Sequence, residues 1–328
     1  MGRNYTASGN IKVLITGISG FVGTNMMRYL IQDDTFKIIG TSRNKRSILH
    51  LAPSLYASYE NQEIYEQGVA SDAYVHLSGK VYDIRDKNNE DEYYKVNYEA
   101  TKKLFDHFVR DRKAKKFIFL STIHVLTENP DMVLDESYQP EPFTPYGKSK
   151  YKAEKFIQKH CPPDKDYYIL RPSMIHGPGN KGNLNLLYNL VKWGIPYPVG
   201  AYNNKRSFVS IENLCFVIKE IIIGNIEKGL YHIADDEPTY THDLVDLIAD
   251  ATDKKGRIWN VPPFFLELAA KIGNFIPFFI NEHRLKKLTG DFIVSNHKIK
   301  EAIDKPLPVR SKDGLRKTLN SLRFDIDL

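Results

Sequence analysis

The sequence predicts an α/β fold with a doubly wound parallel sheet and a smaller, mainly C-terminal second domain. Short apolar, β-branched runs alternate with segments of helical spacing over roughly the first 235 residues, which is the pattern of parallel strands joined by crossover helices. A glycine-rich turn joins the first of these runs to the first helix. At 328 residues, the chain can bury one large core or two smaller ones.

The composition is that of an ordinary globular protein. Hydrophobic residues make up 42% of the sequence and charged residues 26%. No apolar run is long enough to span a bilayer and no signal peptide is recognised, so we expect a cytoplasmic protein without a membrane span. Cys161 and Cys215 are too few for a disulfide framework or a Cys-rich zinc site. The net charge of +6 is spread along the chain, so we expect no nucleic-acid partner.

Residues 11–16, IKVLIT, form the first predicted strand, and a predicted helix follows over 24–32. The turn between them, GISGFVG, has the spacing of a dinucleotide-binding fingerprint. Gly17 permits the tight turn, Gly20 lets the backbone approach a pyrophosphate, and Gly23 lets helix and strand pack closely. The free N–H groups at the start of the helix would then hold the phosphates.

The second predicted strand, KIIGTSR, ends without the acidic residue that bonds the ribose hydroxyl of NAD. Thr41, Ser42 and Arg43 stand there instead, and two hydroxyls with a guanidinium suit a 2′-phosphate. An ordinary surface Arg in a polar loop is the alternative. The strand end favours NADP(H) slightly over NAD(H).

Two later strands also end in small or polar residues. DAYVHLSG is followed by Lys80, and KFIFLSTIHV stays apolar until it reaches Ser121 and Thr122. An amphipathic helix is predicted between them, over 91–111. Because ligands of open α/β sheets bind beyond the carboxyl ends of the strands, Thr122 should face the same crevice as the glycine turn.

The segment FTPYGKSKYKAEKF, residues 143–156, is a predicted helix that places Tyr146 and Lys150 one turn apart on one face. A phenol has an ordinary pKa of about 10, too high for a base at neutral pH. A nearby ammonium and an oxidised nicotinamide would both lower that pKa. Thr122 would then hydrogen-bond a substrate oxygen while Tyr146 exchanges its proton, as hydride transfer from an alcohol requires. A packed Tyr beside an exposed Lys is the alternative.

The glycine turn, the strand-end Ser/Thr pair and Tyr146-x-x-x-Lys150 together resemble the extended short-chain dehydrogenases/reductases of the NAD(P)-dependent epimerase/dehydratase family. Two downstream blocks are similar as well, LRPSMIHGPGNKGN at 170–183 and KRSFVSIENL at 205–214. The resemblance covers most of residues 11–235 and is greatest to the branch of UDP-glucose 4-epimerases and UDP-sugar 4-reductases.

This resemblance implies a domain organisation and an assembly. A Rossmann-type cofactor domain is expected over 11–175 and about 205–235, and a substrate-binding domain over about 176–204 and 236–328. The helices at 91–111 and 146–159 resemble those of the family's dimer interface, so a homodimer is expected.

The resemblance also implies a role for residues along the whole cleft. It makes Thr122, Tyr146 and Lys150 the catalytic set. The expected cofactor-binding residues are Gly17, Ser19, Gly20, Phe21, Val22, Gly23, Thr41, Ser42, Arg43, Leu77, Ser78, Gly79, Lys80, Asn97, Ser121, Tyr146, Lys150 and Pro172. The expected substrate-binding residues are Lys80, Thr122, Asn180, Asn183 and Arg206, of which Arg206 would pair with a diphosphate. No metal is expected.

The activity implied is NAD(P)-dependent redox chemistry at C4 of a UDP-hexose or a UDP-N-acetylhexosamine. A 4-epimerase and a 4-keto reductase would use the same catalytic set, so the sequence leaves both open. Thr122 is followed by Ile123 and His124, not by the two acids of the family's dehydratases, which disfavours dehydration. The alternatives are a non-catalytic NAD(P)-binding regulator and a reductase of a non-sugar carbonyl compound on the same fold.

The segment VPPFFLELAAKIGNFIPFFI, residues 261–280, has an apolar face. Pro277 and the absence of a cationic polar face favour a packed helix that caps the substrate cleft. A helix lying on a membrane surface is the alternative.

Overall fold

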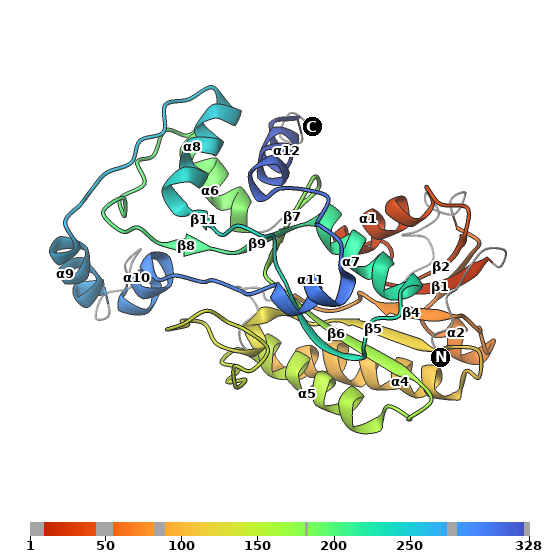
Figure 1. Ribbon diagram of the computed structural model, residues 1–328. Helices are drawn as coiled ribbons and strands as arrows, with labels where there is room; N and C mark the ends of the chain where they lie inside the picture. The colour runs from red at the N-terminus through yellow and green to blue at the C-terminus, as the bar shows by residue number, and fades with distance from the viewer. Residues whose placement is uncertain (1–9, 44–54, 82–88, 181–182, 274–280, 325–328) are drawn as a thin grey trace.

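A seven-stranded parallel sheet forms the centre of the protein (Figure 1). The computed structural model describes residues 10–43, 55–81, 89–180, 183–273 and 281–324. Each neighbouring pair of strands in this sheet runs parallel. The order across the sheet is β10 (Gly229–Ile233), β6 (Asp166–Pro172), β5 (Lys116–Leu120), β4 (Ala73–His76), β1 (Ile11–Thr16), β2 (Phe36–Ser42) and β3 (Ala57–Glu60). The predicted parallel sheet is confirmed.

Helices cover both faces of the sheet because its strands are apolar on both faces. Val13 and Ile15 of β1 pack on one side and Leu14 packs on the other. The first face is covered by α1 (Phe21–Leu30), α7 (Ile211–Ile223) and α11 (His297–Ile303). The second face is covered by α2 (Glu63–Glu66), α4 (Ala100–Arg110) and α5 (Pro145–His160). The sheet is therefore doubly wound, as predicted.

The direction in which strands are added reverses beside β1. The chain places β2 and β3 on one side of β1 and then returns to place β4 on the other side. A crevice opens at such a reversal because the connections after the two central strands leave over opposite faces of the sheet. The carboxyl ends of β1 and β4 therefore mark where a ligand should bind.

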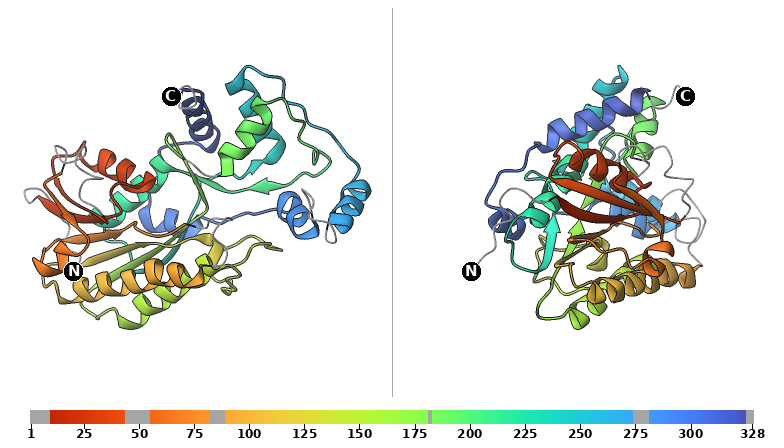
Figure 2. Two further views of the ribbon diagram at one scale, coloured as in Figure 1. Left: turned by 180° about the vertical axis from the view of Figure 1, so that it is seen from behind. Right: turned by 90° about the vertical axis from the view of Figure 1, so that its right-hand side faces the viewer.

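A second group of elements packs on the sheet domain (Figures 1 and 2). It contains two short strand pairs, β7 (Met174–His176) with β9 (Phe208–Ser210) and β8 (Lys205–Arg206) with β11 (Thr239–Tyr240). A separate apolar core joins α6 (Asn183–Lys192), α8 (Thr241–Thr252) and α12 (Ser311–Phe324). The predicted division into a cofactor domain and a substrate-binding domain stays a prediction.

Two elements near the crevice differ from the regular ones expected. The helix predicted over 91–111 starts as α3 (Glu90–Tyr93) and passes through a π-helical turn, η3 (Tyr94–Glu99), before α4 begins. The strand predicted over 116–125 ends at Leu120. Thr122 then caps a 3-10 turn, η4 (Ile123–Val125), because its side chain accepts a hydrogen bond from the His124 N–H. Such irregular turns are frequent at functional sites.

The sequence predicts a packed helix within 261–280. For the part of this range that the structure describes, the prediction is wrong. There, α9 (Pro263–Gly273) contacts α10 (Glu282–Thr289) at one end of the molecule, away from the sheet (Figures 1 and 2). Ala270 is buried against Leu285 of α10, but the large apolar side chains of α9 that face solvent are Phe264, Phe265, Leu268 and Ile272. Residues 274–280 lie outside the described residues. Within the described ranges, no helix is long and apolar enough to cross a membrane.

Candidate functional site

The glycine turn joins β1 to α1 and packs against the end of β4. Gly17 has a φ of 69°, which favours glycine, and a Cβ there would lie 2.8 Å from the Ser78 backbone. A Cβ on Gly23 would lie 2.2 Å from the carbonyl oxygen of Gly17. The turn, the helix and the neighbouring strand end therefore approach one another with no side chain between them, as the spacing predicts.

The first turn of α1 is suited to bind an anion. Gly20 is the N-cap, so no side chain in the described part of the chain caps the N–H groups of this turn. Ser19 and Gly20 are exposed, and Phe21 and Val22 are half-buried. Uncapped N–H groups at the positive end of a helix dipole hold phosphates well. The turn therefore fits the pyrophosphate of a dinucleotide.

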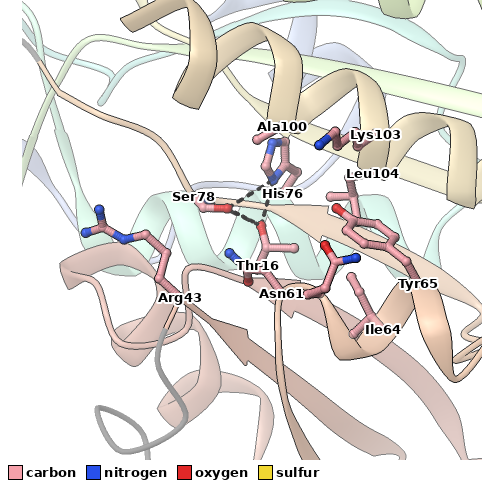
Figure 3. Close-up of a pocket in the computed structure, with 11 residues that line it drawn as sticks. Thr16, Arg43, Asn61, Ile64, Tyr65, His76, Ser78, Ala100, Lys103 and Leu104 are labelled. Atoms are coloured by element: carbon pink, nitrogen blue, oxygen red, sulfur yellow. Dashed lines mark hydrogen bonds between the residues drawn. The ribbon is translucent and has the colours of Figure 1, made fainter. Parts of the chain in front are cut away.

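A cavity of about 290 Å³ opens beside the glycine turn, at the ends of β1, β2 and β4 (Figure 3). Its lining residues are Thr16, Arg43, Asn61, Gln62, Ile64, Tyr65, His76, Ser78, Ala100, Lys103 and Leu104. The His76 ring bonds the Thr16 hydroxyl at 2.6 Å and the Thr101 hydroxyl at 2.9 Å. Burial lowers the pKa of His76 to about 3, so its ring is neutral. This lining has two cations, Arg43 and Lys103, and no carboxylate among the described residues.

The three residues predicted to meet a 2′-phosphate differ in exposure. Arg43 is exposed and lines the cavity (Figure 3). Thr41 is buried, and its hydroxyl donates to the Asn61 side-chain oxygen at 2.8 Å. Ser42 is also buried. Of these three residues, Arg43 is therefore the one that presents a positive charge to an anion in the cavity.

Tyr146 lies in the first turn of α5 and meets Thr122 beyond the end of β5. The helix start is fixed because Thr144 caps it, accepting from the Gly147 N–H at 3.1 Å, and Pro145 occupies the first turn. The half-buried phenol of Tyr146 hydrogen-bonds Thr122. Burial raises the pKa of Tyr146 to about 12, although this hydrogen bond lowers it. The structure thus brings two of the predicted catalytic side chains together.

Lys150 is buried one turn further along α5. Its Nζ donates to the carbonyl oxygen of Leu120, the last residue of β5, at 2.9 Å. A Cβ on Gly79 would approach the Lys150 Nζ to 3.0 Å, so the chain after β4 also packs against the ammonium. Burial lowers the pKa of Lys150 to about 8, and the charge of Glu154 raises it. The ammonium therefore stays charged at neutral pH.

Asn97 in the π-helical turn ties this part of the site together. Its buried amide accepts from the Lys80 N–H at 2.7 Å and donates to the Lys80 carbonyl oxygen at 3.0 Å. It also donates to the Ser149 hydroxyl of α5 at 3.1 Å. The Lys80 ammonium pairs with Glu92 and lies 5.0 Å from the centre of the Tyr93 ring. Asn97 therefore holds the backbone at Lys80 against α5.

A buried ion pair lies one turn beyond Lys150. Glu154 accepts from Arg171 Nε at 3.1 Å and from Arg171 Nη2 at 2.6 Å. Ser121, predicted to bind cofactor, donates its hydroxyl to the same Glu154 carboxylate. Glu154 was not predicted from the sequence, although Tyr146, Lys150 and Glu154 stand at i, i+4 and i+8 and so share one helix face.

The predicted substrate-binding residues outside the sheet have protein partners or lie outside the described side chains. Arg206 is half-buried in β8 and donates to the Lys287 carbonyl oxygen of α10. Asn180 donates to the Ile175 carbonyl oxygen at 3.0 Å. Asn183 begins α6, and its side chain lies outside the described part of the structure.

His124 lies close to Arg206 and just beyond the end of β5. It follows Thr122 by two residues, and its ring centre lies 5.9 Å from that of Phe292. Burial lowers the pKa of His124 to about 4, and the positive charges of Lys287 and Arg206 add to this effect. Arg206 therefore lies on the Thr122 side of the site, near α10.

The remaining predicted residues lie at strand ends. Pro172 is buried at the end of β6. Leu77 packs against the core of the first sheet face, and the Ser78 hydroxyl donates to the Thr16 hydroxyl at 2.8 Å. His76 and Asn61 line the cavity but were not predicted; a His ending an apolar strand was the available signal for the former. No cluster of three or more His, Cys, Asp or Glu side chains that could hold a metal occurs in the described residues.

Comparison with known sequences identifies relatives over most of the chain. The profile of the NAD dependent epimerase/dehydratase family matches residues 13–228. The UDP-glucose 4-epimerase of Vibrio cholerae is 29% identical over 319 residues, which cover 93% of this chain and 94% of that protein. The N-acetyl-alpha-D-glucosaminyl-diphospho-ditrans,octacis-undecaprenol 4-epimerase of Escherichia coli O157:H7 is 28% identical over 264 residues, which cover 77% of this chain and 76% of that protein.

Solved structures share the fold. UDP-glucuronic acid 4-epimerase from Bacillus cereus, solved in complex with NAD, superposes with a TM-score of 0.74 over 96% of this chain and 99% of that chain. The two are 16% identical, so this likeness concerns the fold alone.

Proposed function

The chain belongs to the NAD dependent epimerase/dehydratase family, and from this we propose that it transfers hydride at C4 of a nucleotide sugar. The proposed substrate is a UDP-hexose or a UDP-N-acetylhexosamine, and the reaction is 4-epimerisation or reduction of a 4-keto sugar. The observation that carries the proposal is the hydrogen bond between Tyr146 and Thr122, one helical turn from the buried Lys150. The names of the two sequence relatives support C4 as the reacting position.

Each residue of this set has its own task in the proposed reaction. When bound, the nicotinamide of NAD(P) supplies the hydride acceptor and donor. Tyr146 Oη takes the proton of the sugar 4-hydroxyl during oxidation and returns a proton during reduction. The Thr122 hydroxyl donates to the same sugar oxygen and holds it near the phenol. The glycine turn and the uncapped first turn of α1 hold the cofactor pyrophosphate.

Lys150 and a bound oxidised nicotinamide would together favour this proton transfer. With Lys150 in place, burial still raises the pKa of Tyr146 to about 12, so the positive charge of the nicotinamide is needed to make phenolate accessible near neutral pH. The pKa of Lys150 is lowered only to about 8, so its ammonium is charged at neutral pH and stabilises the phenolate. We also propose that the Lys150 ammonium hydrogen-bonds the ribose that carries the nicotinamide.

The cavity beside the glycine turn supports NADP(H) over NAD(H) as the cofactor. Arg43 is exposed there and Lys103 lines the same cavity, whereas no carboxylate among the described residues does. Two cations favour a 2′-phosphate, and a ribose without phosphate would lack its usual acidic partner.

A second candidate substrate carries the same sugar on a lipid diphosphate. The E. coli O157:H7 relative is named as a 4-epimerase of such a molecule. The exposed apolar side chains of α9 favour this candidate here, because α9 contacts α10 and α10 accepts a hydrogen bond from Arg206, the predicted diphosphate ligand. The reacting sugar and the catalytic set are the same for both candidates.

The activity is tested by incubating the purified protein with NAD(P) and each UDP-hexose, and by reading the C4 configuration by NMR. We expect Tyr146→Phe to lose at least about a hundredfold in turnover, because the proton loses its acceptor. Tyr151→Phe changes a half-buried tyrosine of the same helix and is the matched control. Full function of Tyr146→Phe would instead favour a non-catalytic NAD(P)-binding protein.

The released cofactor separates the two reactions. Mass spectrometry of the nucleotide freed by denaturation should show stoichiometric NAD⁺ if the protein is an epimerase that regenerates its cofactor in place. That result would contradict the assignment of Arg43. An empty site that binds NADPH more tightly than NADH supports the reductase, whose next substrate to try is a 4-keto UDP-sugar.

A further inference from the structure

One face of α9 exposes large apolar side chains. Phe264, Leu268 and Ile272 stand at i, i+4 and i+8 and form one stripe, with Phe265 beside it. The Phe264 side chain is 67% exposed and that of Phe265 is 59% exposed. The opposite side of the helix rests on α10 through Ala270 and Leu266. In a globular protein, grouped exposed apolar side chains mark a surface that another body covers.

Both tryptophans of the chain are exposed, and Trp259 lies on the segment that leads into α9. Trp259, four residues before α9, is 58% exposed, and Trp193 is 68% exposed. The segments that carry them are joined: the Trp259 N–H donates to the Tyr197 carbonyl oxygen at 2.8 Å. Tryptophan is the side chain that most favours the boundary between water and lipid, since its indole ring is apolar and its N–H is polar.

The helices α9 and α10 together carry a net positive charge. Residues 263–273 and 281–290 contain four Lys or Arg and two Glu, so these two segments have a net charge of +2. Lys271 of α9 and Lys286 of α10 are exposed. The acids of the two segments, Glu267 and Glu282, are exposed as well. An apolar face with surrounding positive charge is complementary to an anionic lipid surface.

This surface adjoins the candidate active site. The Arg206 guanidinium donates to α10, and Lys287 of α10 pairs with Glu128 at 3.1 Å. His283 of α10 has its ring centre 6.2 Å from that of Phe143, three residues before the candidate catalytic Tyr146. A surface that binds α9 would therefore lie close to where the substrate enters.

We propose that α9, together with Trp259, docks the protein on the surface of an anionic lipid bilayer. The helix lies in the plane of the membrane with Phe264, Phe265 and Leu268 in the headgroup and upper acyl region. A second copy of the chain is a poorer occupant, since a two-fold contact would bring two α9–α10 pairs, each of net charge +2, together. The proposed contact with the membrane is the same whether the site accepts a UDP-sugar or a sugar on a lipid diphosphate.

The test is binding to vesicles made of equal parts phosphatidylglycerol and phosphatidylcholine, followed by sedimentation and tryptophan fluorescence. We expect the wild type to sediment with these vesicles, with emission shifted to shorter wavelength because Trp259 enters the interface. Phe264→Glu/Phe265→Glu should lower the partition coefficient at least about tenfold. Lys271→Gln/Lys286→Gln should weaken binding to these vesicles but not to pure phosphatidylcholine.

Ile31→Glu/Tyr56→Glu is the matched control, since it removes two exposed apolar side chains from the sheet domain. Binding of NADPH in the absence of vesicles shows whether each variant keeps its fold and its cofactor site, independently of lipid binding. The proposal is overturned if the wild type stays in the supernatant, or if the α9 variant binds as the wild type does. It is also overturned if the α9 variant only dissociates an oligomer, which would make a second copy the occupant.

Discussion

Lys150 has the least ordinary environment of the candidate catalytic residues. Its ammonium is buried, donates to the Leu120 carbonyl oxygen and lies one turn from the Glu154 carboxylate. Glu154 is itself held by Arg171 and Ser121, so its charge is shared among several donors. Burial therefore outweighs the attraction of Glu154 and lowers the pKa of Lys150 to about 8.

This shift predicts a pH dependence of stability. Between pH 8 and the ordinary Lys pKa of 10.5, the unfolded chain holds a proton at this site that the folded chain has released. The free energy of unfolding should therefore rise with pH across that window, whereas below pH 8 the full cost of burying the charge remains. Relative to Lys150→Met, the wild type should gain up to about 3 kcal/mol. Urea unfolding of both proteins at several pH values measures this difference.

Lys148→Met is the control, because it removes an exposed lysine from the same helix. A difference between wild type and Lys150→Met that stays constant with pH would contradict the lowered pKa. A difference that falls as pH rises would mean that Glu154 outweighs burial.

At the scale of elements, the π-helical turn η3 determines where Asn97 lies. A regular helix over 91–111 would turn the residue at this position by a different angle, and its amide would not reach both Lys80 and Ser149. In the structure, the turn places a buried amide between the chain after β4 and α5. The π-helical turn thus links the chain after β4 to α5, and both of these segments pack around Lys150.

Asn97→Ala should therefore impair both stability and activity. The Lys80 peptide and the Ser149 hydroxyl each lose hydrogen bonds to a buried partner, which we expect to cost about 2–4 kcal/mol of unfolding free energy. Turnover should fall about tenfold or more, because Gly79 and Lys150 lose their fixed separation. Urea unfolding and the C4 assay measure the two effects.

Asn320→Ala is a suitable control, since it removes an exposed amide from α12, away from Lys80 and α5. Wild-type stability in Asn97→Ala would show that the amide network is not needed to hold the chain after β4.

The sequence predicted what local pattern determines. The glycine turn and the parallel strands follow from spacing, and the position of Thr122 and Tyr146 beyond one strand end follows from the rule that ligands bind there. The binding of a 2′-phosphate by Arg43 stays a prediction. Glu154 was missed because an acid within a lysine-rich helix resembles a surface residue until Arg171, on another element, is brought to it. The exposure of α9 was missed because apolar periodicity shows which side chains share a face but not what covers that face.

At the scale of the whole molecule, α4 and α5 lie together on the second face of the sheet (Figure 1). Their outer sides are rich in lysines that lie over aromatic rings. The Lys152 ammonium lies 4.4 Å from the centre of the Tyr98 ring, and that of Lys102 lies 5.7 Å from the centre of the Phe156 ring. This is the surface that the sequence predicts for a homodimer, and it is apolar beneath and positively charged outside.

A homodimer formed through α4 and α5 should therefore become tighter with salt. The exposed lysines of this face, which are Lys102, Lys148, Lys152, Lys155 and Lys159, would face the same positively charged surface of the partner copy, and they outnumber the acids on the same side, Glu99 and Asp106. Raising the salt from about 50 mM to about 500 mM shortens the screening length several-fold, so we expect the dimer dissociation constant to fall about tenfold. Sedimentation velocity over a concentration series measures it.

Lys152→Gln/Lys155→Gln should produce the same tightening at low salt, because it removes charge from the centre of this face and leaves the aromatic rings. Lys312→Gln, an exposed lysine at the start of α12, is the matched control. A monomer at every salt concentration would show that the homodimer prediction is wrong. Association that weakens with salt would place the contact on a surface of opposite charges, because salt weakens an association only where it screens an attraction.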